Sequence, residues 1–137
     1  MVVDTSALVA ILNDEPERQA FIDLIATAAT RLISAATLLE ASIVVELRRG
    51  EHAGRELDLF LHRAKFEIVP LDADQVEIAR AAFRRYGKGR HPAGLNFGNC
   101  CSYALAHSRG DTLLFKGQDF TRSDIRPAYA DRPDQPA

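Results

Sequence analysis

The sequence predicts an α/β fold in which a parallel or mostly parallel sheet has helices on its faces. Short apolar runs, several of them β-branched, alternate along the chain with longer segments whose apolar residues recur at helical spacing. Strands that are separated by helices must be joined by crossovers, which favours parallel pairing. The 137 residues, 47% of them hydrophobic, are enough for one domain with a real core.

The first half of the chain predicts two units of strand and helix. Thr5 and Ser6 follow the opening strand and supply hydroxyls that can cap a helix. Pro16 suits the first turn of the next helix. Thr37 can cap a strongly apolar helix that stops at Gly50. The expected elements are a strand at 1–4, helices at 7–12 and from 16 to near 30, a strand at 31–34 and a helix at 38–47.

The second half continues the same alternation. Asp72 or Asp74 is placed to cap the helix after the third strand, and Asn99 is a favourable cap for the last helix. The expected elements are a helix around 57–64, a strand at 66–71, helices around 76–86 and at 100–107, and a buried strand at 112–115. We expect a single domain over residues 1–131 and a frayed tail at 132–137.

Composition excludes several classes of protein. With 17 Lys and Arg against 19 Asp and Glu the net charge is -2, so any surface for nucleic acid must be local. The two cysteines, Cys100 and Cys101, are adjacent, which argues against a disulfide framework and favours the cytoplasm. No segment has the pattern of a signal peptide or a membrane span, so we expect neither export nor a membrane partner. Cysteine and histidine are not spaced as zinc ligands.

Acidic side chains are expected at the carboxyl ends of two strands, where open parallel sheets bind ligands. Asp4 ends the first strand, and Asp119 lies in the loop after the last one. If these strands are neighbours, the two carboxylates lie at the same edge of the sheet. Each could instead only cap a helix or stabilise a turn, so both roles stay open on this evidence.

Glu40 is a stronger candidate because its helix face is apolar. The residues three, four and seven positions later are Ile43, Val44 and Leu47. These should point inward, so the Glu40 carboxylate needs a partner in the interior. It either pairs with an arginine, such as Arg48 or Arg80, or lies at the rim of a polar cavity.

The most basic stretch of the chain is 84–91, which contains two glycines. It could bind phosphates through Arg85, Lys88 and Arg90, or it could be an ordinary solvated helix end. Lys116 stands three residues before the last candidate acid, where it could contact phosphate or neutralise the acids.

Four segments together form a recognisable pattern. They are Val-Val-Asp4-Thr-Ser6-Ala-Leu, Glu40 in an early apolar helix, Gly98-Asn99-Cys-Cys-Ser-Tyr-Ala, and Leu-Leu-Phe-Lys116-Gly-Gln-Asp119-Phe. In order and spacing they resemble a VapC-type toxin of the PIN-domain ribonuclease family along nearly the whole chain. The resemblance implies a PIN-like fold whose mostly parallel five-stranded sheet is flanked by helices on both faces. It also implies the toxin component of a type II toxin-antitoxin system, which cleaves RNA with Mg²⁺ or Mn²⁺, binds a VapB-type antitoxin and forms a homodimer.

The resemblance also assigns the site. Its catalytic positions are Asp4, Glu40, Asn99 and Asp119, with the metal held at Asp4 and Asn99. Related toxins often have an acid where Gly117 stands and another two residues later. Here only Asp119 remains, so the resemblance leaves open whether Asp119 or another acid completes the pocket. Ser6 matches a hydroxyl that supports the acidic pocket in this family.

The chain departs from the family at Asn99, where the family has its third aspartate. Asparagine keeps one acceptor oxygen but lacks the negative charge, so we expect metal affinity and rate to fall. The change is either engineered to inactivate a toxic nuclease, which we favour, or a natural variant.

Two other functions fit some of these residues. A non-catalytic module of the same fold would bind RNA or antitoxin without cleaving RNA. Asn99 is consistent with this function because it replaces a catalytic aspartate of the family. A phosphoacceptor signalling domain would use Asp4, Asp72 and Lys116, although such a site needs an acid pair where the chain has Asp4 and Thr5.

Overall fold

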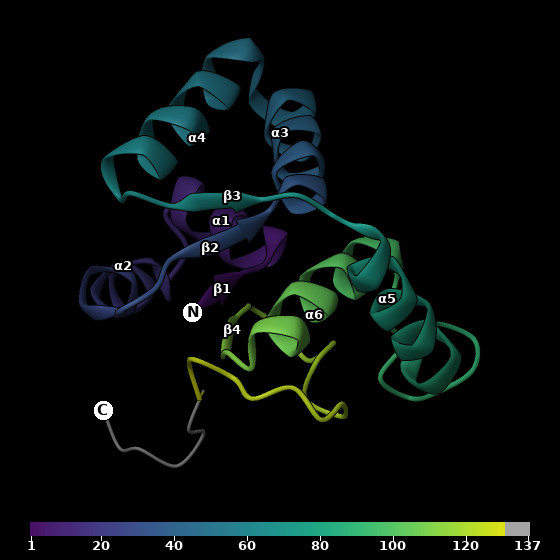
Figure 1. Ribbon diagram of the computed structural model, residues 1–137. Coiled ribbons are helices and arrows are strands. Elements are labelled where there is room, and N and C mark those ends of the chain that lie inside the picture. Colours follow the sequence, from purple (N-terminus) through teal and green to yellow (C-terminus); the bar gives the residue numbers. More distant parts are fainter. Residues whose placement is uncertain (131–137) are drawn as a thin grey trace.

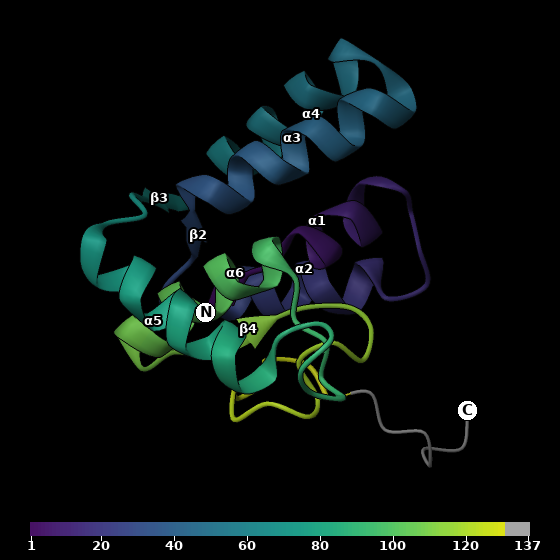
Figure 2. The same ribbon diagram turned by 90° about the vertical axis from the view of Figure 1, so that its right-hand side faces the viewer.

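A parallel sheet of four strands runs through the centre of the protein, with helices on both of its faces (Figures 1 and 2). The structure is a computed structural model that describes residues 1–130. The strands are β1 (Val2–Val3), β2 (Leu32–Ser34), β3 (Glu67–Val69) and β4 (Leu113–Leu114), in the order β3-β2-β1-β4. All pairings between them are parallel, so the predicted α/β fold is confirmed. The tail expected at 132–137 lies outside the described residues.

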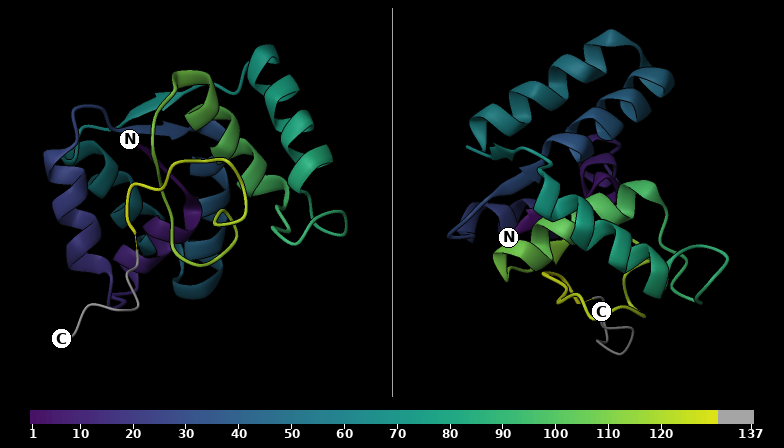
Figure 3. Two further views of the ribbon diagram at one scale, coloured as in Figure 1. Left: turned by 90° about the horizontal axis from the view of Figure 1, so that it is seen from below. Right: turned by 45° about the vertical axis from the view of Figure 1, so that its right-hand side comes forward.

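The helices connect and cover the strands. They are α1 (Thr5–Leu12), α2 (Arg18–Thr27), α3 (Ala35–Arg49), α4 (Glu51–Arg63), α5 (Ala73–Tyr86) and α6 (Phe97–Arg109). Two pairs of helices pack side by side, α3 with α4 and α5 with α6 (Figure 3). None of these described helices is both long and apolar enough to cross a membrane.

Different helices cover the two faces of the sheet. In β1, Val2 packs in the apolar cluster that contains residues of α5 and α6, whereas Val3 packs in the cluster that contains residues of α1 to α4. Leu113 and Leu114 of β4 divide in the same way. Successive side chains of a strand point to opposite faces, so even a strand of two residues joins both layers.

The described residues contain four strands and not the five that the family resemblance implied. A single parallel bridge between Leu113 and Pro127 stands where a fifth strand could form. The Leu113 N–H donates to the Arg126 carbonyl at 3.0 Å, and the Ala128 N–H donates to the Leu113 carbonyl at 2.9 Å. The chain bends just before and just after this bridge, at 123–124 and 128–129, so the pairing does not extend into a ladder.

Two strands run directly into helices because a capping residue ends or follows each strand. Asp4 caps α1 by accepting the N–H two residues later at 3.1 Å, and Ser34, the last residue of β2, caps α3 in the same manner at 3.2 Å. Thr5 and Thr37, which we expected as caps, lie inside helices that begin earlier than predicted. Asp72 caps α5, as one of the two predicted alternatives. Direct passage from strand to helix places the Asp4 carboxylate at the carboxyl edge of the sheet.

Candidate active site

The four predicted catalytic positions line one pocket at the carboxyl edge of the sheet, here called the acidic pocket. Asp4, Glu40, Asn99 and Asp119 surround a hollow of about 390 Å³. They come from the end of β1, from α3, from the first turn of α6 and from the loop after β4. Strands β1 and β4 are neighbours, so Asp4 and the loop that carries Asp119 lie at the same edge of the sheet. The other lining residues are Thr5, Ser6, Val9, Glu15, Val44, Arg48, Asn96 and Lys116.

Asp4 is the most enclosed acid of the pocket, with 2% of its surface exposed. Its Oδ2 accepts hydrogen bonds from the Ser6 N–H at 3.1 Å and the Ser6 hydroxyl at 2.7 Å, and its Oδ1 accepts one from the Ser102 hydroxyl at 2.6 Å. Burial raises the pKa of Asp4, although the hydrogen bonds from Ser102 and Ser6 favour the charged form. A cation beside this carboxylate would offset the cost of burying its charge.

Glu40 lies at the polar rim of the pocket rather than in an ion pair. The Thr5 hydroxyl donates to Glu40 Oε1, and the carboxylate occupies the space that a Cβ at Gly98 would need. Among the described residues, no ion pair joins Glu40 to either expected arginine: Arg80 pairs with a glutamate of its own helix, and Arg48 only lines the same pocket. The sequence-based choice between an arginine partner and a polar cavity is thus resolved in favour of the cavity.

The helix face that we assigned to Glu40 was wrong. Ile43 is 49% exposed and Leu47 is 83% exposed, so neither points into the core. The buried side chains of α3 are those of Thr37, Ala41 and Val45. Helix α3 is apolar on several sides, and the side with smaller residues faces the core, where α1, α4 and α6 pack against it. The hydrophobic pattern alone did not distinguish that side from the one with larger residues.

The sequence suggested Asn99 as the cap of the last helix, and this prediction was wrong. Helix α6 begins at Phe97, and Asn96 is its cap. The Asn96 side chain accepts the Asn99 N–H at 2.9 Å, and Asn99 Oδ1 accepts the Asn96 N–H at 3.1 Å, which completes a capping box. The box needs only an acceptor oxygen at residue 99, which an aspartate also supplies. Nothing in the local structure therefore requires the amide.

Asp119 and Lys116 stand at the mouth of the acidic pocket. Asp119 is exposed in the loop after β4. Lys116 pairs with Glu15 and, at 3.1 Å, with Glu17. Its hydrogen bonds to Glu15 and Glu17 raise the pKa of Lys116, so the amine is charged and already satisfied by carboxylates. Any contact of Lys116 with phosphate would compete with this pairing.

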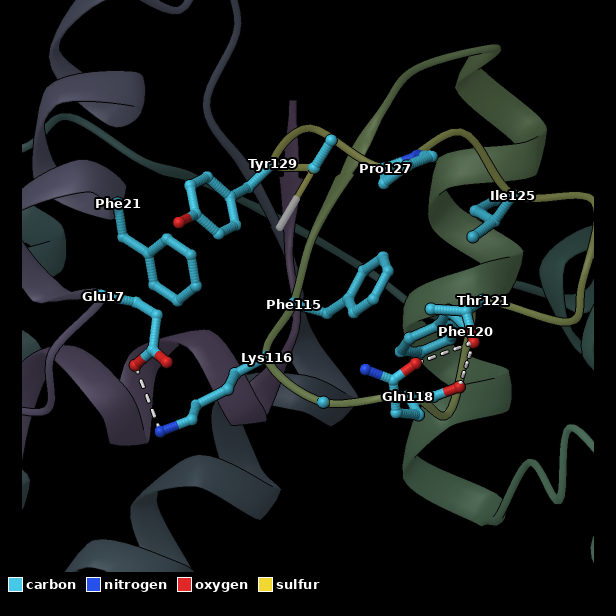
Figure 4. A pocket seen from close by; sticks show the side chains of 12 residues that line it. Glu17, Phe21, Phe115, Lys116, Gln118, Phe120, Thr121, Ile125, Pro127 and Tyr129 are labelled. Carbon is cyan, nitrogen blue, oxygen red and sulfur yellow. Dashed lines mark hydrogen bonds and ion pairs between the residues drawn. The ribbon is translucent and has the colours of Figure 1, made fainter. Parts of the chain in front are cut away.

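A second hollow, of about 420 Å³, lies beside the acidic pocket and shares Lys116 with it. Figure 4 shows Lys116 reaching towards Glu17 on one side and the rings of Phe115, Phe120 and Tyr129 around the hollow. The rings of Phe115 and Phe120 are buried, so they offer little face for stacking. Asp119 lines the acidic pocket, whereas its neighbours in the chain line this second hollow.

The other predicted RNA contacts lie outside the acidic pocket. Arg85, Lys88 and Arg90 are exposed at the end of α5 and in the loop that follows. The Arg85 guanidinium lies 4.9 Å from the ring of Tyr86, and that of Arg90 lies 5.9 Å from the ring of Phe83. The charged ends of these two arginines therefore lie over aromatic rings as cation–π pairs, although both residues are exposed.

Four residues that sequence reasoning missed shape the pocket. Thr5, Gly98, Ser102 and Thr37 contact the acids or one another. A usable signal was present for two of them, because Thr37 lies three residues before Glu40 and Ser102 lies three residues after Asn99. Residues at that spacing share a helix face.

The residues of the pocket fit a hard divalent cation that keeps most of its water. All the candidate donors are oxygens, which Mg²⁺ and Mn²⁺ prefer. Over residues 1–130, no three His, Cys, Asp or Glu side chains are grouped closely enough to hold a metal ion. An amide at Asn99 leaves Asp4 and Glu40 as the inner acids. Burial raises the pKa of Cys100 to about 11, which disfavours the thiolate that a zinc site would need.

The arrangement does not support a phosphoacceptor site. Asp72, the second acid of that hypothesis, caps α5 and lies outside the acidic pocket. Asp72, which follows the edge strand β3, is therefore not an acid partner for Asp4.

Comparisons with known proteins agree with this fold. Residues 1–125 match the PIN domain family. Ribonuclease VapC30 of Mycobacterium tuberculosis is 56% identical over 125 residues, which are 91% of this chain and 95% of that protein. Ribonuclease VapC of Mycolicibacterium smegmatis is 57% identical over 129 residues, which are 94% of this chain and 100% of that protein.

Solved structures of lower identity share the fold. The toxin VapC20 of Mycobacterium tuberculosis, described as cleaving the sarcin-ricin loop, aligns with a TM-score of 0.74 and 19% identity over 90% of this chain and 95% of that one. VapBC2 of Rickettsia felis, bound to a DNA fragment of its promoter, aligns with a TM-score of 0.70 and 21% identity over 92% and 94% of the two chains.

Proposed function

Because the chain belongs to the PIN-domain family and, within it, to the VapC-type toxins, we propose that it is a metal-dependent endoribonuclease of a type II toxin-antitoxin system. The observation that carries the proposal is the acidic pocket, in which Asp4, Glu40, Asn99 and Asp119 meet although they lie far apart in the sequence. Relatives with more than half of their residues identical are named as ribonucleases.

Asp4 and residue 99 would hold the cation, Mg²⁺ or Mn²⁺. A bound cation would act as a Lewis acid and neutralise charge that develops on the phosphate. Ser6 and Ser102 hold the Asp4 carboxylate, and Thr5 holds one oxygen of Glu40. Glu40 Oε2 is then available to accept a proton from an attacking water. Asp119, exposed at the mouth, adds negative charge beside these groups.

We further propose that Asn99 weakens this chain. The amide cannot supply a negative charge, and its nitrogen cannot ligate a metal. Its oxygen is already used by the Asn96 N–H at 3.1 Å. These three effects lower the affinity of the pocket for a divalent cation, so we expect a folded but impaired nuclease.

The RNA backbone would be held by Arg85, Lys88 and Arg90, with Lys116 closer to the acids. The first three residues are exposed, so RNA phosphates could reach them. The net charge of -2 leaves such local clusters as the source of attraction for RNA.

We propose that a VapB-type antitoxin or a second copy of the chain covers α3. Leu39, Ile43 and Leu47 form an exposed apolar row at four-residue spacing, and Phe97 is exposed at the start of α6. Exposed apolar rows of this kind mark interaction surfaces, and a helix is the usual partner for such a face.

A second candidate function is a non-catalytic module of the same fold that binds RNA or antitoxin. The observation that favours it is Asn99, which removes a carboxylate from the pocket while preserving the capping box. The two candidates differ in whether any divalent cation supports cleavage.

End-labelled RNA incubated with the protein and Mg²⁺, Mn²⁺ or EDTA tests the proposal. We expect slow cleavage with metal that EDTA stops and that Glu40→Gln reduces further. Glu46→Gln is the matched control, because Glu46 lies on the same helix but packs against Gly54 of α4. Equal cleavage by the unmodified protein and Glu40→Gln would contradict the assigned site, and RNA binding without any cleavage would favour the second candidate.

A further inference from the structure

Two buried hydroxyls lie behind the acidic pocket. Ser102 of α6 is fully buried, and Thr37 of α3 is 1% exposed. The Ser102 hydroxyl lies 2.6 Å from Asp4 Oδ1 and 3.1 Å from the Thr37 hydroxyl. Three elements that are distant in the sequence therefore meet at one pair of hydrogen bonds.

The direction of these bonds follows from the groups involved. A charged carboxylate can only accept, so Ser102 must donate its one proton to Asp4. Thr37 must then donate to the oxygen of Ser102. The result is a directed chain from Thr37 through Ser102 to Asp4.

The chain of hydroxyls lies one helical turn from the residues of the site. Thr37 precedes Glu40 by three residues in α3, and Ser102 follows Asn99 by three residues in α6. Residues at this spacing share a face of their helix. The hydroxyl pair therefore joins the two helix faces that carry Glu40 and Asn99, and ties both to Asp4.

The bonds to the two oxygens of Asp4 differ in origin. Oδ2 is held by Ser6, only two residues away, as part of the cap of α1. Oδ1 is held by Ser102, which is 98 residues away. Loss of Ser102 would leave Oδ2 bonded to Ser6 but would remove the hydrogen bond that holds Oδ1, so the carboxylate would be less restrained about its Cβ–Cγ bond.

We propose that Thr37 and Ser102 are positioning residues that fix the orientation of the Asp4 carboxylate towards the cation. This inference rests on the proposed function for its catalytic meaning. A merely structural pair of buried hydroxyls would contribute to stability without controlling the site, so the test has to measure metal binding and the orientation of Asp4 rather than stability.

Binding of Mn²⁺, measured by calorimetry or by its electron paramagnetic resonance signal, gives the first readout. We expect Ser102→Ala and Thr37→Val each to weaken Mn²⁺ binding by about 10-fold, a typical effect of losing a group that orients a metal ligand. Thr37→Ser keeps the hydroxyl and should restore affinity. Ser108→Ala is the control in α6, because the Ser108 hydroxyl donates only to the Leu105 carbonyl of its own helix.

Crystal structures of the unmodified protein and of Ser102→Ala give a second readout that needs no metal. We expect the Asp4 carboxylate to rotate, or to become disordered, only in the variant. An Asp4 carboxylate unchanged in Ser102→Ala overturns the proposal, as does unchanged Mn²⁺ affinity in both Ser102→Ala and Thr37→Val. If the unmodified protein binds no Mn²⁺, the proposed metal site is wrong. The orientation of Asp4 in the two crystal structures is then the only readout that tests the positioning role.

Discussion

The carboxylate of Glu40 in α3 lies in the space that a Cβ at Gly98 in α6 would fill. Gly98 has ordinary helical backbone angles, so its conformation does not demand glycine. The missing side chain instead lets an acid rest against the first turn of α6, where the helix dipole favours negative charge. Space for Glu40 is therefore the physical reason for glycine at this position.

Gly98→Ala should displace Glu40 without removing its charge. Alanine is the better helix former by about 0.5–1 kcal/mol, so the fold should persist. In the background of Asn99→Asp, we expect RNA cleavage to fall about 10- to 100-fold, as misplacement of a catalytic group does. Initial cleavage rates and thermal unfolding of the two proteins measure both expectations.

Gly54→Ala is a closely matched control. A Cβ at Gly54 would meet the carboxylate of Glu46 in the same way, but this pair lies between α3 and α4 and away from the acidic pocket. Its cleavage rate should match that of the background protein. A loss as large as that in Gly98→Ala would show that the effect is not specific to Glu40.

The pH dependence of stability should report the buried Asp4. Burial raises the folded-state pKa of Asp4 above its unfolded value, so its contribution is fully present below the unfolded pKa and is lost as the pH rises through the folded pKa. Asp4→Asn keeps an acceptor for the cap and has no such loss. Urea unfolding in EDTA should show the variant gaining stability relative to the parent as the pH rises from about 4. A difference that is independent of pH would contradict this.

The sequence predicted the parallel sheet with helices on its faces well, for a physical reason. Short apolar strands alternating with helices allow few arrangements other than a parallel sheet, and a parallel sheet collects the residues that end its strands at one edge. Asp4 and Asp119 could be placed together only on the assumption that their strands are neighbours, which the pairing of β1 with β4 then shows them to be. The place of the other two catalytic positions beside them came from the family resemblance. The partners of the acids could not be predicted, because Ser102 and Gly98 reach them only through the packing of α6 against the sheet and α3.

The orientation of α3 shows where pattern reasoning failed. Its smaller residues, Ala41 and Val45, face the core, whereas Ile43 and Leu47 face solvent. When only the pattern of a single helix is known, the face with the large aliphatic residues is the one expected to be buried. Here the close approach of neighbouring helices selects small residues, and the larger ones remain on the surface that we assign to a partner.

Ile43→Glu with Leu47→Glu tests that surface. Both side chains are exposed, so the change should alter unfolding of the monomer by no more than about 0.5 kcal/mol. We expect it to abolish self-association or binding to the antitoxin, measured by light scattering and by co-purification of the two proteins. The exposed pair Asp58→Lys and Glu67→Lys, on α4 and β3, is a control for added surface charge. Retained assembly in the α3 variant would place the interface elsewhere.

Charge reversal at Arg85, Lys88 and Arg90 should lower the affinity for RNA. It should also make that affinity less dependent on salt concentration. If each residue contacts one phosphate of a single strand, the slope of log affinity against log salt should fall by about 2. Filter binding over a range of KCl concentrations measures it. Reversal at Arg55, Arg63 and Lys65, exposed at α4 and just after it, is the matched control. Equal loss in both triple variants would indicate general electrostatics rather than a binding site.

Asn99→Asp tests the central claim most directly. The aspartate can accept the same N–H from Asn96, so the capping box and the fold should be preserved, which circular dichroism can verify. We predict that Mg²⁺-dependent RNA cleavage rises by at least about tenfold, equivalent to about 1.4 kcal/mol of activation free energy, and that EDTA abolishes it. Equal and negligible cleavage by the folded Asn99→Asp protein and the unmodified protein would contradict the account.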